Sequence, residues 1–162
     1  MSEAAQNQID IRKAEAGDSD AACGLVRRSI TELCTLDHNG IPAIVEGMLI
    51  NKTPANMKAW IETLGSFVLI AEVDGEMAGV GAFTGDGEMT LLYVSPEFRF
   101  RGVSKALLAA LEAEARKLGL PSCALVSTDT AKPFFLAAGY VGYDEAEDDF
   151  GMDSSSMTKD LA

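Results

Sequence analysis

The sequence has few cysteines, one histidine, a deficit of basic residues and no long apolar run. Its three cysteines, Cys23, Cys34 and Cys123, lack the paired spacing of metal ligands, and an odd number makes a poor disulfide framework, so we expect reduced thiols. The 13 Lys and Arg against 25 Asp and Glu give a net charge of −12, which argues against nucleic-acid and anionic-membrane partners. The first residues show no basic and apolar signal pattern, and no window approaches the ~18–20 apolar residues of a membrane span. We therefore expect a cytoplasmic protein that binds neither nucleic acid nor membrane.

What the chain does have is a large apolar fraction, 48% of its 162 residues, which is enough for one hydrophobic core. No repeat or linker divides it, so we predict a single domain over residues 1–162. Asp74-Gly75 between two apolar runs predicts a tight hairpin, and Thr53 followed by Pro54 predicts a helix start. Together with the hydrophobic periodicity, these signals predict strands at 9–12, 67–73, 77–83, 88–94, 122–128, 140–144 and 152–159, and helices at about 18–34, 42–50, 54–64, 102–118 and 132–138.

The most informative segment leads from an apolar strand ending at Val94 to a strongly helical stretch that opens near Gly102. The first turn of a helix has unpaired N–H groups and the positive end of the macrodipole, and both suit a phosphate. Arg99 and Arg101 add positive charge beside these donors, and Gly102 lets an anion approach the backbone closely. The segment therefore predicts an anion-binding site. The alternative is an ordinary strand–loop–helix with a solvated basic loop.

The loop from Arg99 to Ser104 reads Arg-Phe-Arg-Gly-Val-Ser and resembles motif A of the GCN5-related N-acetyltransferases, which is Gln/Arg-x-x-Gly-x-Gly/Ala after a strand. Two positions depart from that motif: Ser104 replaces Gly or Ala, and Phe100 stands where Gly is frequent. A second signature of the family, Ala-x-x-Phe-Tyr-x-x-x-Gly-Phe, is similar to residues 131–140, with Phe135 in place of the tyrosine. The order of the predicted elements matches as well, so the resemblance covers nearly the whole chain.

This resemblance implies an α/β protein with the GNAT acyl-CoA N-acyltransferase fold, a mixed and mostly antiparallel sheet of about seven strands with splayed central strands, flanked by helices. It implies acetyl-CoA (coenzyme A) as co-substrate and no metal. The loop would hold the pyrophosphate, the fourth strand would pair with the pantetheine arm, and Phe134 would pack on that arm unless it belongs to the core. The residues assigned to coenzyme binding are Leu92, Tyr93, Val94, Arg99, Phe100, Arg101, Gly102, Val103, Ser104 and Phe134.

Acetyl transfer to an amine requires removal of a proton, because a primary amine is mostly protonated at neutral pH. Glu88, at the start of the fourth strand, stands where some family members carry a glutamate in this role, although it could equally be a solvated strand-edge residue. A main-chain N–H late in that strand could stabilise the developing oxyanion. Phe135 has no proton to give to the leaving thiolate, which leaves Ser127, Tyr143, water or no general acid at all.

The acceptor site is the least defined part of the sequence. The single histidine, His38, follows Asp37 in a polar loop, in a region that usually forms part of the acceptor site in this family. It could accept the amine proton or line the pocket, and an ordinary surface role is the alternative. The acidic residues between 144 and 153 lack the regular spacing of a calcium loop, so we expect a solvated loop there rather than a metal site.

These observations lead to one main hypothesis, an N-acetyltransferase that moves an acetyl group from acetyl-CoA to a primary amine in a ternary complex. The alternatives are an acyl-CoA-binding sensor on the same fold, without efficient chemistry, and a protein-interaction domain. The acceptor, a small molecule or a peptide amine, is left open. A homodimer is compatible with the family.

Overall fold

The computed structural model describes residues 8–34, 38–128, 130–147 and 153–161. The first half contains β1 (Asp10–Lys13), α2 (Ser19–Leu33), α4 (Pro42–Leu49), α5 (Pro54–Glu62), β2 (Phe67–Val73), β3 (Glu76–Phe83) and β4 (Glu88–Val94). The second half contains α6 (Val103–Lys117), β5 (Ser122–Thr128), α7 (Lys132–Ala137), β6 (Val141–Glu147) and β7 (Asp153–Asp160). Among the described residues, none of the helices combines the length and apolar character needed to cross a bilayer.

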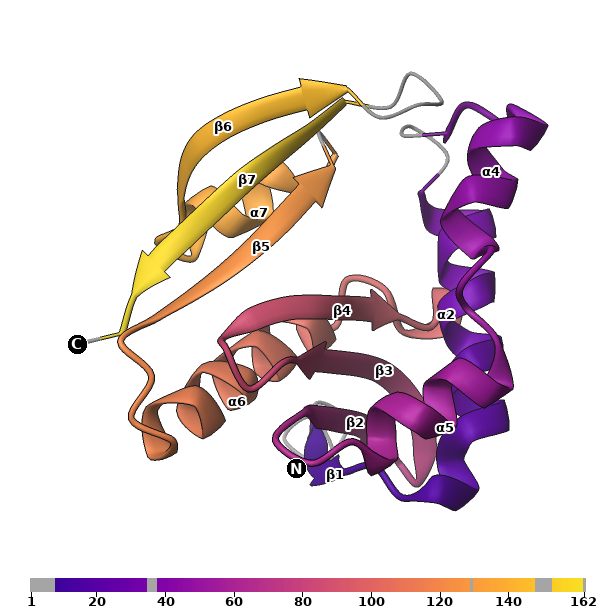
Figure 1. Ribbon diagram of the computed structural model, residues 1–162. Helices are drawn as coiled ribbons and strands as arrows, with labels where there is room; N and C mark the ends of the chain where they lie inside the picture. Colours follow the sequence, from indigo (N-terminus) through magenta and orange to yellow (C-terminus); the bar gives the residue numbers. More distant parts are fainter. Residues whose placement is uncertain (1–7, 35–37, 129, 148–152, 162) are drawn as a thin grey trace.

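The strands form one seven-stranded sheet in the order β1-β2-β3-β4-β5-β7-β6 (Figure 1). All neighbouring strands are antiparallel except β4 and β5, which are parallel. The parallel pair is also the shortest ladder, because only Glu88 and Met89 of β4 are in register with β5. Beyond Met89 the two strands diverge, as Figure 1 shows. The predicted mixed sheet with splayed central strands is confirmed.

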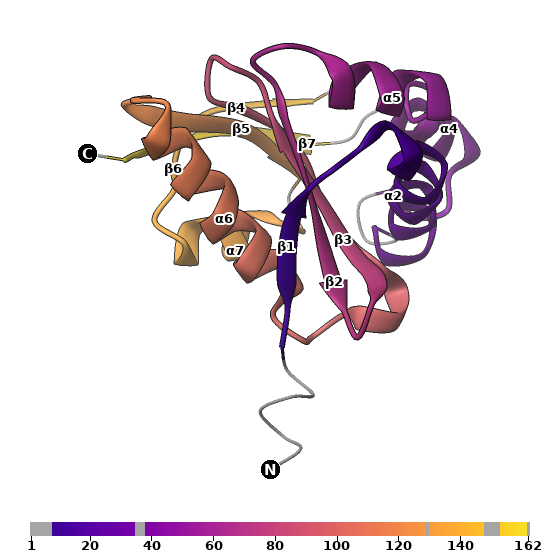
Figure 2. The same cartoon turned by 90° about the horizontal axis from the view of Figure 1, so that it is seen from below.

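Helices cover both faces of the sheet. Figure 2 shows α6 and α7 on one side of β1–β3 and α2, α4 and α5 on the other. The two faces have separate hydrophobic clusters: Leu107 and Leu111 of α6 belong to one, and Val26 and Ile30 of α2 belong to the other. The burial of these apolar side chains supplies most of the driving force for folding.

Helix α6 lies unusually close to the sheet because two residues of β3 have no side chain. A Cβ atom on Gly79 would lie 2.7 Å from Leu107 Cδ1, and one on Gly81 would lie 2.9 Å from Leu111 Cδ1. Real Cβ atoms essentially never approach so closely, so a side chain at either position would require the helix or its leucines to shift. This packing fixes where the first turn of α6 stands relative to β4.

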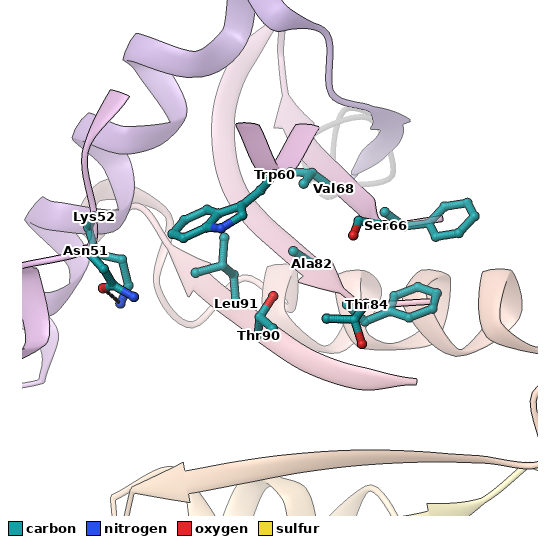
Figure 3. Close-up of a pocket in the computed structure, with 11 residues that line it drawn as sticks. Asn51, Lys52, Trp60, Ser66, Val68, Ala82, Thr84, Thr90 and Leu91 are labelled. Carbon is teal, nitrogen blue, oxygen red and sulfur yellow. Dashed lines mark hydrogen bonds between the residues drawn. The ribbon is translucent and has the colours of Figure 1, made fainter. Parts of the chain in front are cut away.

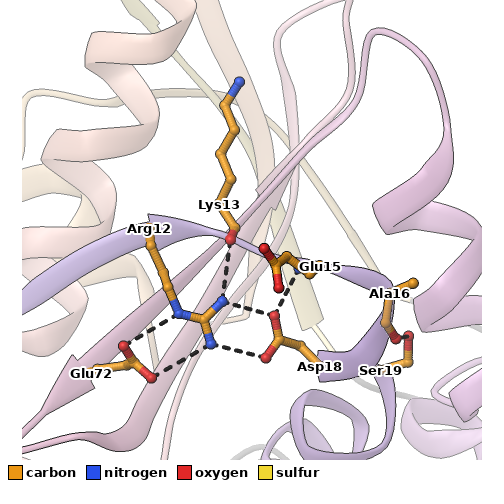
Figure 4. A network of polar contacts seen from close by, with 7 residues as sticks. All are labelled: Arg12, Lys13, Glu15, Ala16, Asp18, Ser19 and Glu72. Atoms are coloured by element: carbon orange, nitrogen blue, oxygen red, sulfur yellow. Dashed lines mark hydrogen bonds and ion pairs between the residues drawn. The ribbon is translucent and has the colours of Figure 1, made fainter.

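The start of α2 is held to the sheet by an ion-pair network around Arg12 of β1 (Figure 4). The Arg12 guanidinium donates to both carboxylate oxygens of Asp18, at 2.8 and 2.9 Å, and its Nε lies 3.3 Å from a carboxylate oxygen of Glu72 on β2. The Asp18 carboxylate also accepts a hydrogen bond from the Glu15 N–H. Hydrogen bonding to Arg12, followed by that to Glu15, lowers the pKa of Asp18 below its ordinary 3.8, against the opposing effect of burial.

Local sequence signals account for most boundaries. The Thr53 hydroxyl caps α5 by accepting from the Asn56 N–H, as predicted, and Asp74 and Gly75 both have positive φ in the hairpin turn. Two 3₁₀ turns, Ala16–Asp18 and Pro96–Phe98, were not predicted. The last two strands extend to Glu147 and Asp160, beyond the predicted ends, because they pair with each other over most of their length.

Candidate active site

The divergence of β4 and β5 leaves one edge of β4 without a partner strand. From Leu91 to Val94, β4 pairs with β3 but not with β5. Just before this stretch the register with β3 changes, since Ala82 is opposite Leu91 but Phe83 is opposite Met89. Thr90 is therefore the extra residue of a β-bulge. Bulges bend a strand and redirect its groups, and they are frequent beside active sites.

A cavity of about 270 Å³ occupies the space between the diverging strands, and we call it the central cleft. Its floor is the edge of β4 that faces away from β3 and lies beyond the ladder with β5, and main-chain groups at such an edge can bind an extended ligand in the manner of an added strand. The described residues that line it are Ser29, Leu33, Cys34, Met48, Met89–Val94, Ser104, Leu125, Val126, Ser127, Thr128, Thr130, Ala131 and Phe135. Leu92, Tyr93 and Val94, which the sequence assigned to the coenzyme arm, are all among them.

One end of the central cleft opens onto the first turn of α6, where a second cavity of about 310 Å³ lies. We call it the loop cavity. Leu33, Val94 and Ser104 line both cavities, so the two adjoin. The other described residues of the loop cavity are Phe98, Arg99, Phe100, Gly102, Val103, Lys105 and Phe134.

The first turn of α6 carries no side-chain cap. Gly102 is the N-cap residue, with a φ of +80°, and it makes no side-chain cap hydrogen bond in the described part of the chain. The N–H groups of Val103, Ser104 and Lys105 have no intrahelical acceptor by the geometry of a helix start. These N–H groups lie at the N-terminal end of α6, which is also the positive end of the helix dipole. An uncapped, glycine-preceded helix start beside a cavity therefore fits a phosphate group.

The two loop arginines are both stacked on aromatic rings. The Arg99 guanidinium lies 4.5 Å from the centre of the Phe100 ring, and that of Arg101 lies 5.4 Å from the centre of the Phe98 ring. Arg99 lines the loop cavity, whereas Arg101 does not. Phe100 has a positive φ of 63° and is 91% exposed, so the chain holds a bulky residue in a conformation that favours glycine.

The segment between β4 and the loop is attached to α2. The Glu97 carboxylate pairs with the guanidinium of Arg28 and accepts a hydrogen bond from the Ser95 hydroxyl. These hydrogen bonds, led by that of Ser95, lower the pKa of Glu97 to about 2. Ser95 is itself buried, and its N–H donates to the Ala78 carbonyl. The base of the loop is thus fixed to both β3 and α2.

On the other side of the Thr90 bulge lies a further cavity of about 270 Å³, which we call the α5 pocket (Figure 3). Thr90 and Leu91 line both this pocket and the central cleft, so the two adjoin at the bulge. Its other described lining residues are Asn51, Lys52, Trp60, Ser66, Phe67, Val68, Ala82, Phe83 and Thr84. This pocket was not predicted from the sequence.

Glu88 is exposed at the start of β4, at the end where β4 still pairs with β5. It does not line the central cleft or the α5 pocket, but it lies two residues before Thr90, at which the two adjoin. Its N–H donates to the Thr84 hydroxyl at 3.3 Å and its carbonyl accepts from the Thr84 N–H. A role for its carboxylate remains a prediction.

His38 is buried rather than exposed in a polar loop, with 3% of its surface accessible. Its Nδ1 accepts a hydrogen bond from the Gly40 N–H at 2.9 Å, so the ring proton is on Nε2, which donates to the Ile30 carbonyl at 3.0 Å. Both nitrogens are engaged by the backbone, and His38 does not line any of the three cavities. The ring holds the end of α2 in place. Asp37 lies outside the described residues.

The other candidate groups occupy different environments. Phe135 is buried and lines the central cleft, whereas Phe134 is half-buried and lines the loop cavity. The Ser127 hydroxyl, also in the central cleft, donates to the Thr128 carbonyl at 2.8 Å. Tyr143 is 66% exposed on β6 and lines none of the three cavities. The side chains of the acidic residues between 144 and 153 lie outside the described part of the structure.

Comparison with known proteins gives the family. Residues 45–161 match the model of the acetyltransferase (GNAT) domain, which is most of the chain, and the protein therefore belongs to the GNAT acetyltransferase family. A curated relative, acetyltransferase plu1384 of Photorhabdus laumondii, is 43% identical over 61 residues. That match covers 36% of this chain and 43% of the relative, so the chain spans less than half of the relative's length.

Solved structures agree on the fold. A protein from Rhodopseudomonas palustris, named GCN5-related N-acetyltransferase: aminotransferase, class-II, superimposes with a TM-score of 0.83 at 24% identity, over 93% of this chain and 94% of the other. The PaiA N-acetyltransferase of Thermoplasma acidophilum, solved in complex with coenzyme A, gives a TM-score of 0.78 at 22% identity, over 94% of this chain and 99% of the other. Identities this low establish a shared fold, and the fold predicted from the sequence is confirmed.

Proposed function

We propose that this protein transfers an acetyl group from acetyl-CoA to a primary amine by direct attack in a ternary complex. One observation carries the proposal: the central cleft and the α5 pocket adjoin at the Thr90 bulge, one on each side of it. Two substrates that enter from opposite sides would meet there. No covalent enzyme intermediate is then needed, because the amine can reach the thioester directly.

The residues of the cleft fit coenzyme A in two places. The uncapped first turn of α6 supplies N–H donors for the pyrophosphate, with Arg99 at the rim of the loop cavity. The edge of β4 from Leu91 to Val94, along which β5 is not in register, supplies main-chain donors and acceptors for the amide groups of the pantetheine arm. Coenzyme A is the bound ligand of the PaiA N-acetyltransferase, which has the same fold.

In the reaction the amine nitrogen forms a bond to the acetyl carbon, the bond from that carbon to sulfur breaks, and the thiolate of coenzyme A leaves. The attacking amine must lose a proton, and Glu88 would accept it, through water, because its carboxylate is not in the cavity wall. A main-chain N–H of β4, beyond its ladder with β5, would stabilise the oxyanion that develops on the acetyl group.

The test measures free thiol released from acetyl-CoA with a panel of amines and peptides, each against a blank without acceptor. Amine-dependent release supports the transferase. The variant Glu88→Gln should lower turnover by about 10²-fold while the Kd for coenzyme A stays within about twofold. Normal turnover of Glu88→Gln would remove Glu88 from the mechanism. A double variant, Arg101→Glu with Gly102→Asp, should abolish coenzyme binding without unfolding, and unchanged binding would contradict the assigned cradle.

The second candidate is a sensor that binds an acyl-CoA without efficient transfer. The observation that favours it is the buried Phe135, since a phenyl ring in the central cleft cannot protonate a leaving thiolate. Tight binding of acetyl-CoA together with no thiol release across the whole amine panel would favour the sensor.

A further inference from the structure

We propose that the α5 pocket selects an acceptor of one chemical class: a small primary amine that also carries a carboxylate, with an apolar body of amino-acid size. Lys52 would bind the carboxylate and Trp60 would pack on the apolar body. This inference rests on the proposed function, because it concerns the second substrate of the same reaction.

The charge of the α5 pocket comes from one residue. Among the described residues that line it, Lys52 is the only charged one, and no carboxylate is present in that lining. This contrasts with the whole chain, whose net charge is −12. Within the described part of the chain, no carboxylate forms an ion pair with Lys52. The pocket is therefore locally positive in an acidic protein, and it is complementary to an anionic group.

The Lys52 ammonium has two neutral hydrogen-bond acceptors. It donates to the side-chain oxygen of Asn51 at 2.6 Å and to the Met48 carbonyl at 3.3 Å. An ammonium group has three N–H donors, so one is left for a ligand. Neutral partners orient the group without cancelling its charge. Because Lys52 is half-buried, a carboxylate bound there would interact more strongly than one in water.

The backbone around Lys52 is fixed by contacts from α2. The Arg27 guanidinium donates to the Lys52 carbonyl at 2.8 Å and to the Leu49 carbonyl at 3.1 Å, and the Cys23 thiol donates to the Lys52 carbonyl at 3.3 Å. From α5, the Asn56 side chain donates to the Asn51 carbonyl at 2.8 Å. These contacts fix the main chain from which Lys52 projects, and the hydrogen bonds of its ammonium to Asn51 and Met48 orient the side chain, which lowers the entropic cost of binding.

The rest of the α5 pocket suits an apolar body with an amine at its inner end. Figure 3 shows the Trp60 indole beside Leu91, with Lys52 and Asn51 on one flank and Thr90 between them and Thr84. The volume of about 270 Å³ falls just below the roughly 300–1,000 Å³ of pockets that hold drug-sized ligands. An amine held with its carboxylate on Lys52 would present its nitrogen toward Thr90, where the pocket adjoins the central cleft.

The same features disfavour polycations. A polyamine or an aminoglycoside would place several positive charges beside Lys52, and the described lining offers no carboxylate to receive them. Like charges in a half-buried site repel each other. The overall acidity of the chain would attract such amines to the surface but would not hold them in this pocket.

The sequence contains a single tryptophan, Trp60, so its fluorescence reports binding in the α5 pocket without any turnover. We would titrate the full chain, with coenzyme A present and absent, using two matched pairs of amines. The first pair is leucine and 3-methylbutylamine, which is leucine without its carboxylate. The second pair is phenylalanine and phenethylamine. Thiol release from acetyl-CoA is measured separately for the same four amines.

We expect each amino acid to bind at least about 10-fold more tightly than its partner without a carboxylate. In the variant Lys52→Met the affinities for the two members of each pair should differ by no more than about twofold. Lys52→Arg, which keeps the charge, should preserve the preference for the amino acid. Lys58 is exposed on α5, the helix that carries Trp60, and Lys58→Met is the matched control that should leave the preference unchanged. Equal or tighter binding of the plain amines, or a preference that survives in Lys52→Met, would overturn the inference.

The two readouts separate this inference from the proposed function. A carboxylate preference without thiol release from any amine would support the assignment of Lys52 and contradict the transferase. Efficient acetylation of both members of each pair, with equal affinities, would support the transferase and contradict the selectivity inferred for Lys52.

Discussion

Gly79 of β3 and Val103 in the first turn of α6 lie so close that a Cβ atom on Gly79 would be 2.7 Å from Val103 Cγ1. This contact links the fold to the candidate site, because the first turn of α6 supplies the N–H groups of the phosphate cradle. Val103 and Leu107, which would meet the new methyl group, are both buried, so one of them must shift to make room for it.

The variant Gly79→Ala should therefore destabilise the protein and weaken coenzyme binding together. We expect a loss of about 1–3 kcal/mol in the free energy of unfolding, the usual cost of overpacking a core. The Kd for coenzyme A should rise roughly threefold or more, because a displaced helix start misaligns its N–H donors. Urea denaturation and calorimetric titration with coenzyme A measure the two effects.

Gly81 provides the matched control for this experiment. Gly81→Ala would press on Leu111, two turns farther along α6, and so strain the same interface away from the cradle. It should lower the free energy of unfolding by a similar amount but leave the Kd for coenzyme A within about twofold of its original value. Equal effects of both variants on the Kd would show that the helix moves as a whole and would contradict a local role of Gly79.

Phe100 should be replaceable with a gain in stability. Its φ of +63° is costly for a side chain with a Cβ, and its ring is 91% exposed, so little burial is lost on removal. We expect Phe100→Gly to raise the free energy of unfolding by about 0.5–1 kcal/mol, even though the contact with Arg99 is lost. Chemical denaturation measures this change. A clear loss of stability would mean that the ring makes a contribution that its exposure does not reveal.

The elements of the fold could be predicted from the sequence because their boundaries are set by local chemistry. The Asp74-Gly75 turn needs positive φ at both positions, and the Thr53 cap needs only a hydroxyl near the Asn56 N–H. Such signals act over a few residues. The strand–loop–helix around Gly102 was identified for the same reason, since the special φ and the uncapped helix start are local.

The parts that sequence reasoning missed depend on contacts between distant segments. The α5 pocket forms where the turn at Lys52 faces β2, β3 and β4, and nothing in the local pattern reports that arrangement. The bulge at Thr90 arises from the way β4 aligns with β3, a strand that precedes it in the chain. The burial of His38 arises from backbone partners at Ile30 and Gly40, although its neighbours in the sequence are polar.

A buried polar network on the α6 side of the sheet gives a prediction about stability alone. Glu112 of α6 is 5% exposed, and its carboxylate accepts from the Tyr140 hydroxyl and pairs with the Lys159 ammonium, each at 2.9 Å. Burial, followed by the nearby charge of Glu112, raises the pKa of Tyr140, so the hydroxyl stays a donor. Lys159→Met should lower the free energy of unfolding by about 3 kcal/mol, because a buried carboxylate loses its counter-charge.

Removing both charges should recover part of that loss. In the double variant Glu112→Gln with Lys159→Met, the neutral amide still accepts from Tyr140, and we expect at least about 1 kcal/mol of stability to return. Urea denaturation of the unmodified protein and of the two variants measures the loss and its recovery. The Kd for coenzyme A should be unchanged throughout, since none of these residues lines the central cleft or the loop cavity. A double variant less stable than Lys159→Met would show that the charge on Glu112 is itself stabilising.

The contact between Asp18 and Arg12 should make stability depend on pH in a defined direction. Because the pKa of Asp18 is lowered in the folded protein, its contribution is complete above the ordinary value of 3.8 and is lost as the pH falls through the lower folded pKa. Asp18→Asn should therefore lower the free energy of unfolding by about 2 kcal/mol near neutral pH. This gap in stability between the variant and the unmodified protein should narrow only in acid. Urea denaturation at about pH 7, 5 and 3 measures the gap, with Asp86→Asn, an exposed turn residue, as the control. A gap of constant size down to about pH 3 would mean that Asp18 stabilises α2 through the shape of its hydrogen bonds rather than through its charge.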